Sequence, residues 1–168
     1  MTVALALLAF VTLQRLAELV IARRNTRRLI AGGAVEIGAG HYPLLVLLHT
    51  GWLASLWMFA LRGHAAIWWP AVIGYALAEL ARVWVMASLG RYWTTRIIVP
   101  RETPVVRRGP YRFLHHPNYW VVAFEIALLP LALGSWTLAL VFSALNAAVL
   151  WWRIRVEEGS LAPRRKTA

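Results

Sequence analysis

The chain has 168 residues, 60% of them hydrophobic and 15% charged, with a formal net charge of +11 and no cysteine. An ordinary soluble domain is less apolar and more charged, so the composition disfavours that class and predicts one membrane-embedded domain over residues 1–168. The lack of cysteine excludes disulfides, thiol nucleophiles and thiolate metal sites.

Five apolar segments follow one another along the chain, over about residues 2–21, 42–61, 67–89, 118–134 and 135–152. Each predicts a transmembrane helix, because about 20 apolar residues span a bilayer. The last two are short and separated only by Gly134-Ser135, so we expect them to form a tight helical hairpin. The predicted fold class is therefore an all-α polytopic membrane protein with five transmembrane helices.

The positions of the basic residues predict the orientation of these helices. Outside the spans, every Lys and Arg except Arg62 follows the first, third or fifth segment, all on one side of the membrane. The positive-inside rule makes that side cytoplasmic, which places the N-terminus outside and the C-terminus in the cytoplasm. Because the charge lies between apolar spans, we interpret it as a topology signal and expect no nucleic acid partner. We expect the first segment to be a retained span, since it lacks the basic start of a signal peptide.

The predicted domain has two parts, a three-helix membrane part over residues 1–89 and a part with the functional segments over 90–168. The second begins with a loop at residues 90–117, which is too long for a simple connection and is expected to be functional. Its stretch WTTRIIVPRETPVV, residues 93–106, is rich in β-favouring side chains and predicts a short β-hairpin.

The stretch RRGPYRFLHHPNYW, residues 107–120, is unusually polar for a segment that leads into an apolar helix. Gly109-Pro110 signals a turn, and Pro117 suits the first position of a helix, which places His116 near its N-cap. The positive end of the helix dipole would then face the neighbouring arginines of the loop, a setting that attracts an anionic ligand group. The alternative is an interfacial turn whose arginines extend to the membrane surface.

The tail WWRIRVEEGSL, from Trp151 onward, supplies charges of the opposite sign. Arg153 and Glu157 are four residues apart and share a helix face, and Glu158 follows. The hairpin would bring these carboxylates beside the basic loop, an arrangement suited to a zwitterionic ligand. The alternative is an ordinary surface ion pair.

Polar side chains also lie within the predicted spans: Gln14, Arg15, Glu18, Glu79, Arg82, Glu125 and Asn146. Arg15–Glu18 and Glu79–Arg82 are each three residues apart, so we expect each pair partly to neutralise itself on one helix face. Such groups form either a structural network between helices or a functional site. We expect Glu125 and Asn146 near the site or between helices. The sequence has no dinucleotide or P-loop motif and no HExxH, and we predict no metal site.

The segment GPYRFLHHPNYW, followed by a helical hairpin and RIRVEE, resembles the isoprenylcysteine carboxyl methyltransferase family of integral membrane enzymes. LGRYWTTRIIVP and LQRLAEL are similar to its bacterial members, and His115 replaces an arginine of the family pattern. The positions that match the pattern are Gly109, Tyr111, His116, Pro117, Tyr119, Arg153, Ile154, Glu157, Glu158 and Leu161.

The resemblance implies a plasma (inner) membrane enzyme that uses S-adenosylmethionine, releases S-adenosylhomocysteine and has its active site on the cytoplasmic face. The implied catalytic residues are Arg153, Glu157 and Glu158. The implied cofactor-binding residues are Gly109, Tyr111, His116, Pro117, Asn118, Tyr119 and Glu158. The expected partners are membrane lipids and a lipid-like acceptor that enters from the bilayer, with no obligate protein partner indicated.

The implied reaction methylates an oxygen. The acceptor is either the carboxylate of an isoprenylcysteine-type substrate or the hydroxyl of an alkylpyrone or alkylresorcinol. Phospholipid N-methylation is the alternative reaction. A non-enzymatic haem- or metal-binding membrane protein is the alternative from another class.

Overall fold

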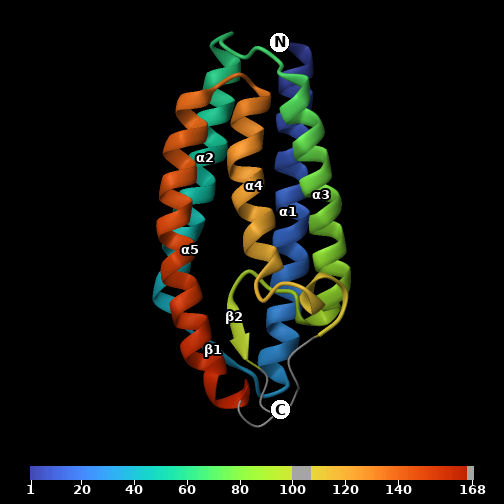
Figure 1. Cartoon of the computed structure of the whole chain (residues 1–168), viewed down its shortest axis with the longest axis vertical. Coiled ribbons are helices and arrows are strands. Elements are labelled where there is room, and N and C mark those ends of the chain that lie inside the picture. Colours follow the sequence, from blue (N-terminus) through green and yellow to red (C-terminus); the bar gives the residue numbers. More distant parts are fainter. Residues whose placement is uncertain (100–106, 166–168) are drawn as a thin grey trace.

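The computed structural model describes residues 1–99 and 107–165, with the side chains of residues 41 and 157–165 excepted. The helices α1 (Thr2–Ala31), α2 (Tyr42–Leu61), α3 (Trp69–Leu89), α4 (Pro117–Ala132) and α5 (Trp136–Arg165) run side by side in an elongated bundle (Figure 1). Short 3₁₀ turns η1 (Ala39–His41), η2 (Gly90–Tyr92) and η3 (Gly109–Arg112) and the strands β1 (Val35–Ile37) and β2 (Ile97–Val99) complete the described elements.

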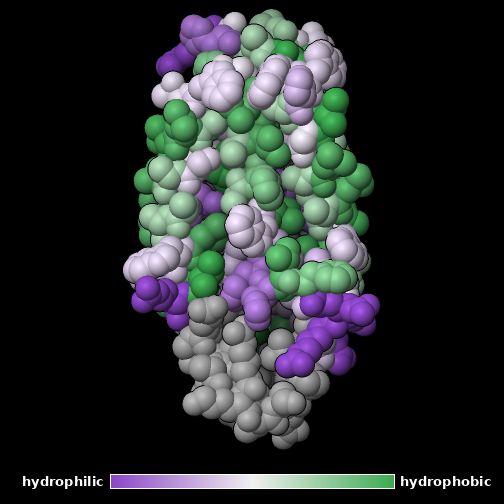
Figure 2. Space-filling model, in the orientation of Figure 1, coloured by the Kyte–Doolittle hydropathy of each residue, from purple (hydrophilic) through white to green (hydrophobic). Residues whose placement is uncertain are grey.

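The all-α fold class predicted from the sequence is confirmed. Within the described residues, four helices are long and apolar enough to cross a membrane: Thr2–Ala31, Tyr42–Leu61, Trp69–Tyr92 and Trp136–Val156. Helix α4 is apolar but has only 16 residues. Hydrophobic side chains cover most of the visible face along the bundle, and hydrophilic ones are grouped nearer its two ends (Figure 2).

Helices α1 and α5 extend well beyond the apolar segments that predicted them, to Ala31 and Arg165. The end of an apolar segment shows where the hydrophobic surface ends. The helix itself continues into polar sequence until a residue such as glycine or proline interrupts the backbone hydrogen bonds. In α1 the basic segment after the span has good helix propensity, and the first interruption is the Gly32-Gly33 pair. The bundle therefore carries helical extensions at the end where the strands lie (Figure 1).

One apolar core joins four helices of the bundle. Its fully buried members include Leu8 of α1, Leu56 of α2 and Leu129 of α4, and Tyr75 of α3 packs with them. Trp52 on α2 is 2% exposed, and its indole N–H donates to the Ile126 carbonyl oxygen of α4 at 3.3 Å. The short α4 is therefore held among the longer helices by packing on both sides.

The turn between α4 and α5 requires glycine. Gly134 has φ of +82°, and a Cβ there would lie 2.8 Å from the Ala66 carbonyl oxygen. The Ala66 N–H in turn donates to the Leu133 carbonyl, which fixes this turn against the connection before α3. Helices α4 and α5 then pack along one another.

The two strands pair antiparallel, with Glu36 of β1 opposite Ile98 of β2. The β-favouring stretch after α3 therefore does form a strand, but that strand pairs with the α1–α2 connection. The return half of the predicted hairpin falls in residues 100–106, outside the described residues. Arg96 donates to Glu36 at 2.8 Å, so a salt bridge reinforces the link between the two connections.

Candidate functional site

The turn η3 is pressed against the end of α3, and Gly109 makes this approach possible. Gly109 has φ of +58°, and a Cβ there would lie 2.0 Å from the Ser88 Oγ. Arg108 Nε donates to the Ser88 carbonyl oxygen at 2.8 Å, which fastens the same turn. Tyr111, next in the turn, packs against the buried cluster of Val85, Trp93 and Val121. The conformation of η3 is therefore determined by α3.

Helix α4 begins as the sequence predicts. His116 is its N-cap residue and Pro117, which is buried, is in the first turn. The His116 side chain makes no capping hydrogen bond, and its ring stacks on Tyr119 with centroids 5.3 Å apart and an interplanar angle of 18°. In the first turn Pro117 has no N–H, and the Tyr119 and Trp120 N–H groups donate to the His116 carbonyl oxygen at 3.1 and 3.5 Å, so the Asn118 N–H is the backbone donor that this end of α4 offers.

Asn118, in the same turn, has a buried Oδ1 with no hydrogen-bond partner in the described part of the chain. A buried polar atom is normally paired, so an orphaned one indicates a missing ligand or water. The orphaned atom is an acceptor and needs a donor from its partner. The start of α4 thus offers the Asn118 N–H as a donor and the Asn118 Oδ1 as an acceptor.

Arg153 of α5 closes the site from the opposite side. It is 7% exposed, its Nε donates to the Tyr119 hydroxyl at 2.8 Å, and its Nη2 donates to the Thr95 carbonyl at 2.9 Å. The guanidinium also lies 5.5 Å from the centroid of the Tyr119 ring. One side chain therefore joins α5, the first turn of α4 and the segment after α3.

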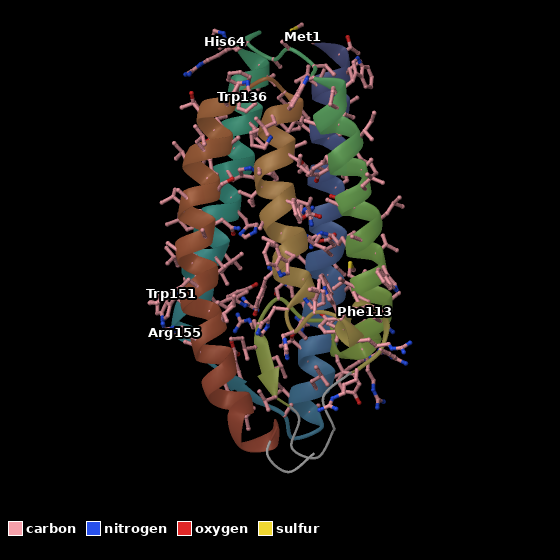
Figure 3. The ribbon with its side chains drawn as sticks, viewed as in Figure 1. Met1, His64, Phe113, Trp136, Trp151 and Arg155 are labelled. Atoms are coloured by element: carbon pink, nitrogen blue, oxygen red, sulfur yellow. The ribbon has the colours of Figure 1, made fainter. Side chains whose placement is uncertain are left out.

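The remaining predicted site residues are either exposed to solvent or have side chains outside the described residues. His115, the replacement for the family arginine, is exposed, as are Arg107 and Arg112 of the same motif. The backbone of Glu157 and Glu158 belongs to α5, but their side chains lie outside the described residues. Their predicted roles stay predictions. Phe113 of the motif and Arg155 of α5 lie at the same end of the bundle (Figure 3).

These groups fit the chemistry of S-adenosylmethionine. Its carboxylate suits the N-terminal turn of α4 and the neighbouring positive charges. Its ammonium or ribose hydroxyl groups would supply the donor that Asn118 Oδ1 lacks. Its sulfonium suits the faces of stacked aromatic rings, which attract cations. The unpaired Asn118 oxygen requires a partner that donates a hydrogen bond, which S-adenosylmethionine could provide.

A second polar cluster lies deeper in the bundle, and it corrects one expectation. Arg15 pairs with Glu18 at 2.8 Å as expected, and also reaches Glu79 at 2.9 Å and Glu125 at 3.1 Å. Among the described residues, Arg82 pairs with Glu125 and with Glu18, the latter at 3.3 Å, so the predicted Glu79–Arg82 pair is wrong. The partners of Arg82 come from the facing helices α1 and α4, and not from Glu79 one turn away on its own helix.

We call this cluster the intramembrane ionic network; it also includes Gln14, which donates to Glu79. Its residues join α1, α3 and α4, and both arginines and all three glutamates are largely buried. The arrangement matches the inter-helix network considered from the sequence. Glu125, which the sequence placed near the site or between helices, is bound by both arginines.

Sequence reasoning did not identify Thr95, which contacts Arg153, or Tyr42, which contacts Thr95. Thr95 takes part through its carbonyl, which accepts from Arg153, and a backbone group leaves no mark in the side-chain pattern. The Thr95 hydroxyl also lies 3.3 Å from the Tyr42 hydroxyl at the start of α2. The signal available was the position of Thr95 in LGRYWTTRIIVP, a segment already similar to the family.

Comparison with known proteins gives a family match and two relatives. The family model described as isoprenylcysteine carboxyl methyltransferase (ICMT) family matches residues 71–163, which hold η3, α4 and most of α5. The uncharacterized protein YpbQ of Bacillus subtilis is 36% identical over 158 residues, covering 92% of this chain and 94% of that protein. An uncharacterized protein of Haemophilus influenzae is 26% identical over 152 residues, covering 88% of each.

No solved structure matches this chain at a significant level. The matched region contains the described site from Gly109 to Arg153, and the first relative covers nearly the whole chain. This chain therefore belongs to the isoprenylcysteine carboxyl methyltransferase family, and that membership implies a membrane methyltransferase.

Proposed function

We propose that this protein is an S-adenosylmethionine-dependent O-methyltransferase that acts on a lipid-like acceptor at the cytoplasmic face of the plasma (inner) membrane. The proposal includes five transmembrane helices, with α4 and α5 as a hairpin, the N-terminus outside and the C-terminus in the cytoplasm. The observation that carries it is the convergence of Arg153 with Tyr119 at the first turn of α4, beside the unpaired Asn118 oxygen.

The residues of this chain would hold the cofactor by its amino-acid end and by its sulfonium. The Asn118 N–H and the positive end of the α4 dipole bind its carboxylate, and Asn118 Oδ1 accepts from its donors. Tyr119 and His116 present their rings to its cationic part. Gly109, Tyr111 and Pro117 shape the turn that carries these groups, and Glu158 extends the site from α5. When bound, S-adenosylmethionine supplies an electrophilic methyl group.

Arg153 orients the oxygen that receives the methyl group. Two of its N–H donors are engaged by Tyr119 and Thr95, so the guanidinium is held in one place instead of sampling many rotamers. A held charge at a reacting centre accelerates reaction mainly by positioning. Glu157, one turn further along α5, continues the same face and is the second proposed catalytic carboxylate beside Glu158.

The acceptor enters from the bilayer. Trp120 and Phe124 of α4 are 58% and 55% exposed, so the helix that begins at the site presents apolar side chains outward. A lipid tail can remain among such side chains while its head reaches the start of α4. The acceptor is an isoprenylcysteine-type carboxylate, which needs no base, or a hydroxyl of an alkylpyrone or alkylresorcinol, which does.

Calorimetry with S-adenosylhomocysteine tests the cofactor half of the proposal. We expect binding by the wild-type protein in lipid nanodiscs, and weaker binding by about 3- to 10-fold in Asn118→Leu, because a neutral hydrogen bond is lost. His64→Gln, at the opposite end of the bundle (Figure 3), should bind as wild type. A haem absorbance band in the purified protein, with no S-adenosylhomocysteine binding, would support the non-enzymatic alternative.

A further inference from the structure

Trp93, in the segment after α3, has a buried indole N–H without an acceptor. The side chain is 4% exposed, and its Nε1 has no hydrogen-bond partner among the described residues. An indole nitrogen can only donate, so the missing partner is an acceptor. An unpaired donor in an apolar setting carries an uncompensated desolvation cost, and native structures rarely contain one. Trp93 therefore indicates a ligand atom or a water that accepts a hydrogen bond at this place.

The backbone of Trp93 is fixed through both of its polar groups. Its N–H donates to the Gly90 carbonyl oxygen at 3.1 Å, and its carbonyl accepts from Asn25 Nδ2 of α1 at 2.8 Å. Asn25 is itself buried. The Trp93 side chain lies in one buried cluster with Val85 of α3 and Val121 of α4. The indole N–H is thus held in place before any ligand binds, which reduces the entropy lost on binding.

Val121 connects the indole to the first turn of α4. It lies in the same buried cluster as Trp93 and three residues after Asn118, and residues at that spacing share a helix face. Tyr111 of η3 packs against the same cluster. The unpaired donor of Trp93 and the unpaired acceptor of Asn118 therefore lie beside one face of α4, about one helical turn apart along the helix. A single ligand of the size of a nucleoside can reach both groups.

The chain after Trp93 makes a second connection to the site. Thr95, two residues further on, accepts from Arg153 Nη2 at 2.9 Å. Two residues span at most about 7 Å of chain, so the Trp93 backbone lies close to Thr95. The same guanidinium donates to the Tyr119 hydroxyl in the first turn of α4. Trp93 therefore belongs to the group of segments that forms the proposed cofactor site.

The surroundings of the indole favour a neutral, flat acceptor. S-adenosylmethionine carries three kinds of acceptor, which are its carboxylate, its ribose oxygens and the ring nitrogens of its adenine. A carboxylate loses much solvation among apolar side chains such as Val85 and Val121, whereas a ring nitrogen loses far less. A ribose would place further hydroxyl groups against the same side chains. Tyr111 adds an aromatic side chain, which suits a purine. The adenine is therefore the part of the cofactor that fits.

We propose that Trp93 recognises the adenine of the cofactor, through a hydrogen bond from its indole N–H to a purine ring nitrogen. This assignment rests on the proposed function and adds a binding residue to it. Asn118 keeps its role toward the ammonium or ribose hydroxyl groups, so the two unpaired groups bind different parts of one molecule. The contact is far from the sulfonium in the bonding of the cofactor, and it therefore contributes to binding and base selectivity, not to the methyl transfer step.

Calorimetry with analogues of S-adenosylhomocysteine tests this contact. In the 1-deaza, 3-deaza and 7-deaza analogues, one purine ring nitrogen is replaced by a C–H group. We expect the wild-type protein in lipid nanodiscs to bind one of them about 3- to 10-fold more weakly than S-adenosylhomocysteine, because a neutral hydrogen bond is lost. Trp93→Phe should bind S-adenosylhomocysteine more weakly by a similar factor, and should show no further loss with that analogue. The two losses do not add because both changes remove the same bond.

Trp52→Phe is the matched control. The Trp52 indole is similarly buried, but its N–H already donates to the Ile126 carbonyl oxygen. This variant should lose stability and keep the wild-type preference among the analogues. Equal binding of all four ligands by the wild-type protein would overturn the inference, whether or not Trp93→Phe folds. An equal loss for all four ligands in Trp93→Phe would assign the indole to packing alone, and unchanged binding of all four would assign its N–H to a structural water.

Nuclear magnetic resonance observes the indole N–H directly. In protein whose tryptophans are isotopically labelled, the indole signal that is missing from Trp93→Phe belongs to Trp93. Saturating S-adenosylhomocysteine should move this signal downfield, as a new hydrogen bond does, and the weakly bound deaza analogue at saturation should not. An unmoved Trp93 signal in protein that binds S-adenosylhomocysteine would overturn the adenine contact and leave the proposed function standing. No binding of S-adenosylhomocysteine by the wild-type protein would contradict the proposed function, and the adenine contact with it.

Discussion

Arg153 of α5 donates through Nε to the Tyr119 hydroxyl of α4 at 2.8 Å, and thereby joins the two segments that carry the family motifs. One motif contains GPYRFLHHPNYW and the other RIRVEE, and more than 30 residues lie between these two side chains in sequence. The hydrogen bond brings the N-terminal turn of α4 to a fixed guanidinium.

Tyr119→Phe removes this hydrogen bond and keeps the ring. The free Arg153 Nε then lacks a buried partner, so we expect the free energy of unfolding to fall by about 1–3 kcal/mol. We also expect methyl transfer to fall about tenfold, because Arg153 is less well positioned. Chemical denaturation and initial rates measure the two effects. Tyr92→Phe is the control, since its hydroxyl bonds to Arg91 at the surface and both quantities should stay unchanged.

Gly109→Ala should be destabilising by about 1–3 kcal/mol, because the new Cβ overlaps Ser88 and the backbone is left-handed. Loss of the η3 position should abolish S-adenosylhomocysteine binding. Gly51→Ala in α2, where a Cβ meets nothing within 4 Å, should leave the protein as stable or more so. Ser88→Gly should restore part of the stability in the double variant; no recovery would contradict the proposed clash.

Glu125→Gln tests the intramembrane ionic network. Glu125 pairs with both arginines, and breaking a buried ion pair from one side is destabilising by about 3–5 kcal/mol. Glu36→Gln is the control, because its partner Arg96 is 40% exposed and an exposed pair contributes under about 1 kcal/mol. Unfolding in nanodiscs or detergent compares them. Equal effects of the two substitutions would mean that the network does not hold the helices together.

Because the chain has no cysteine, single introduced cysteines can test the orientation of the protein in the membrane. His64→Cys and Phe113→Cys place single thiols at opposite ends of the bundle (Figure 3). In intact cells a membrane-impermeant maleimide should label the first and spare the second, and opening the cells should expose both. The reverse labelling pattern would contradict the proposed topology, and labelling of both from outside would contradict a cytoplasmic site.

The helices could largely be predicted because the start and end of each one depend on its local sequence. The bounds of α2 agree with its apolar segment, and the start of α4 follows from Pro117 after His116. The cross-helix pairing of the ionic network could not be predicted, because spacing within one helix says nothing of the charges on its neighbours. The partner of β2 was missed for the same reason, since β1 lies in a distant connection.

For the site, the sequence indicated the side chains but not how they are held. Arg153 and Tyr119 were both expected from the family pattern, yet their mutual hydrogen bond depends on how α4 and α5 pack. The orphaned atoms of Asn118 and Asn146 are likewise invisible in sequence, because a missing partner is a property of the packed bundle.

Methyl transfer from labelled S-adenosylmethionine to defined lipids in nanodiscs tests the central claim most directly. The panel contains an alkylresorcinol, an alkylpyrone, a prenylcysteine and a phospholipid amine, and wild type is compared with Arg153→Lys. We expect label on an oxygen of a lipid-like acceptor, and at least about a tenfold lower rate in Arg153→Lys, which loses the Nε donor to Tyr119. Label on the phospholipid amine alone, or equal rates in both proteins, would contradict an O-methyltransferase centred on Arg153.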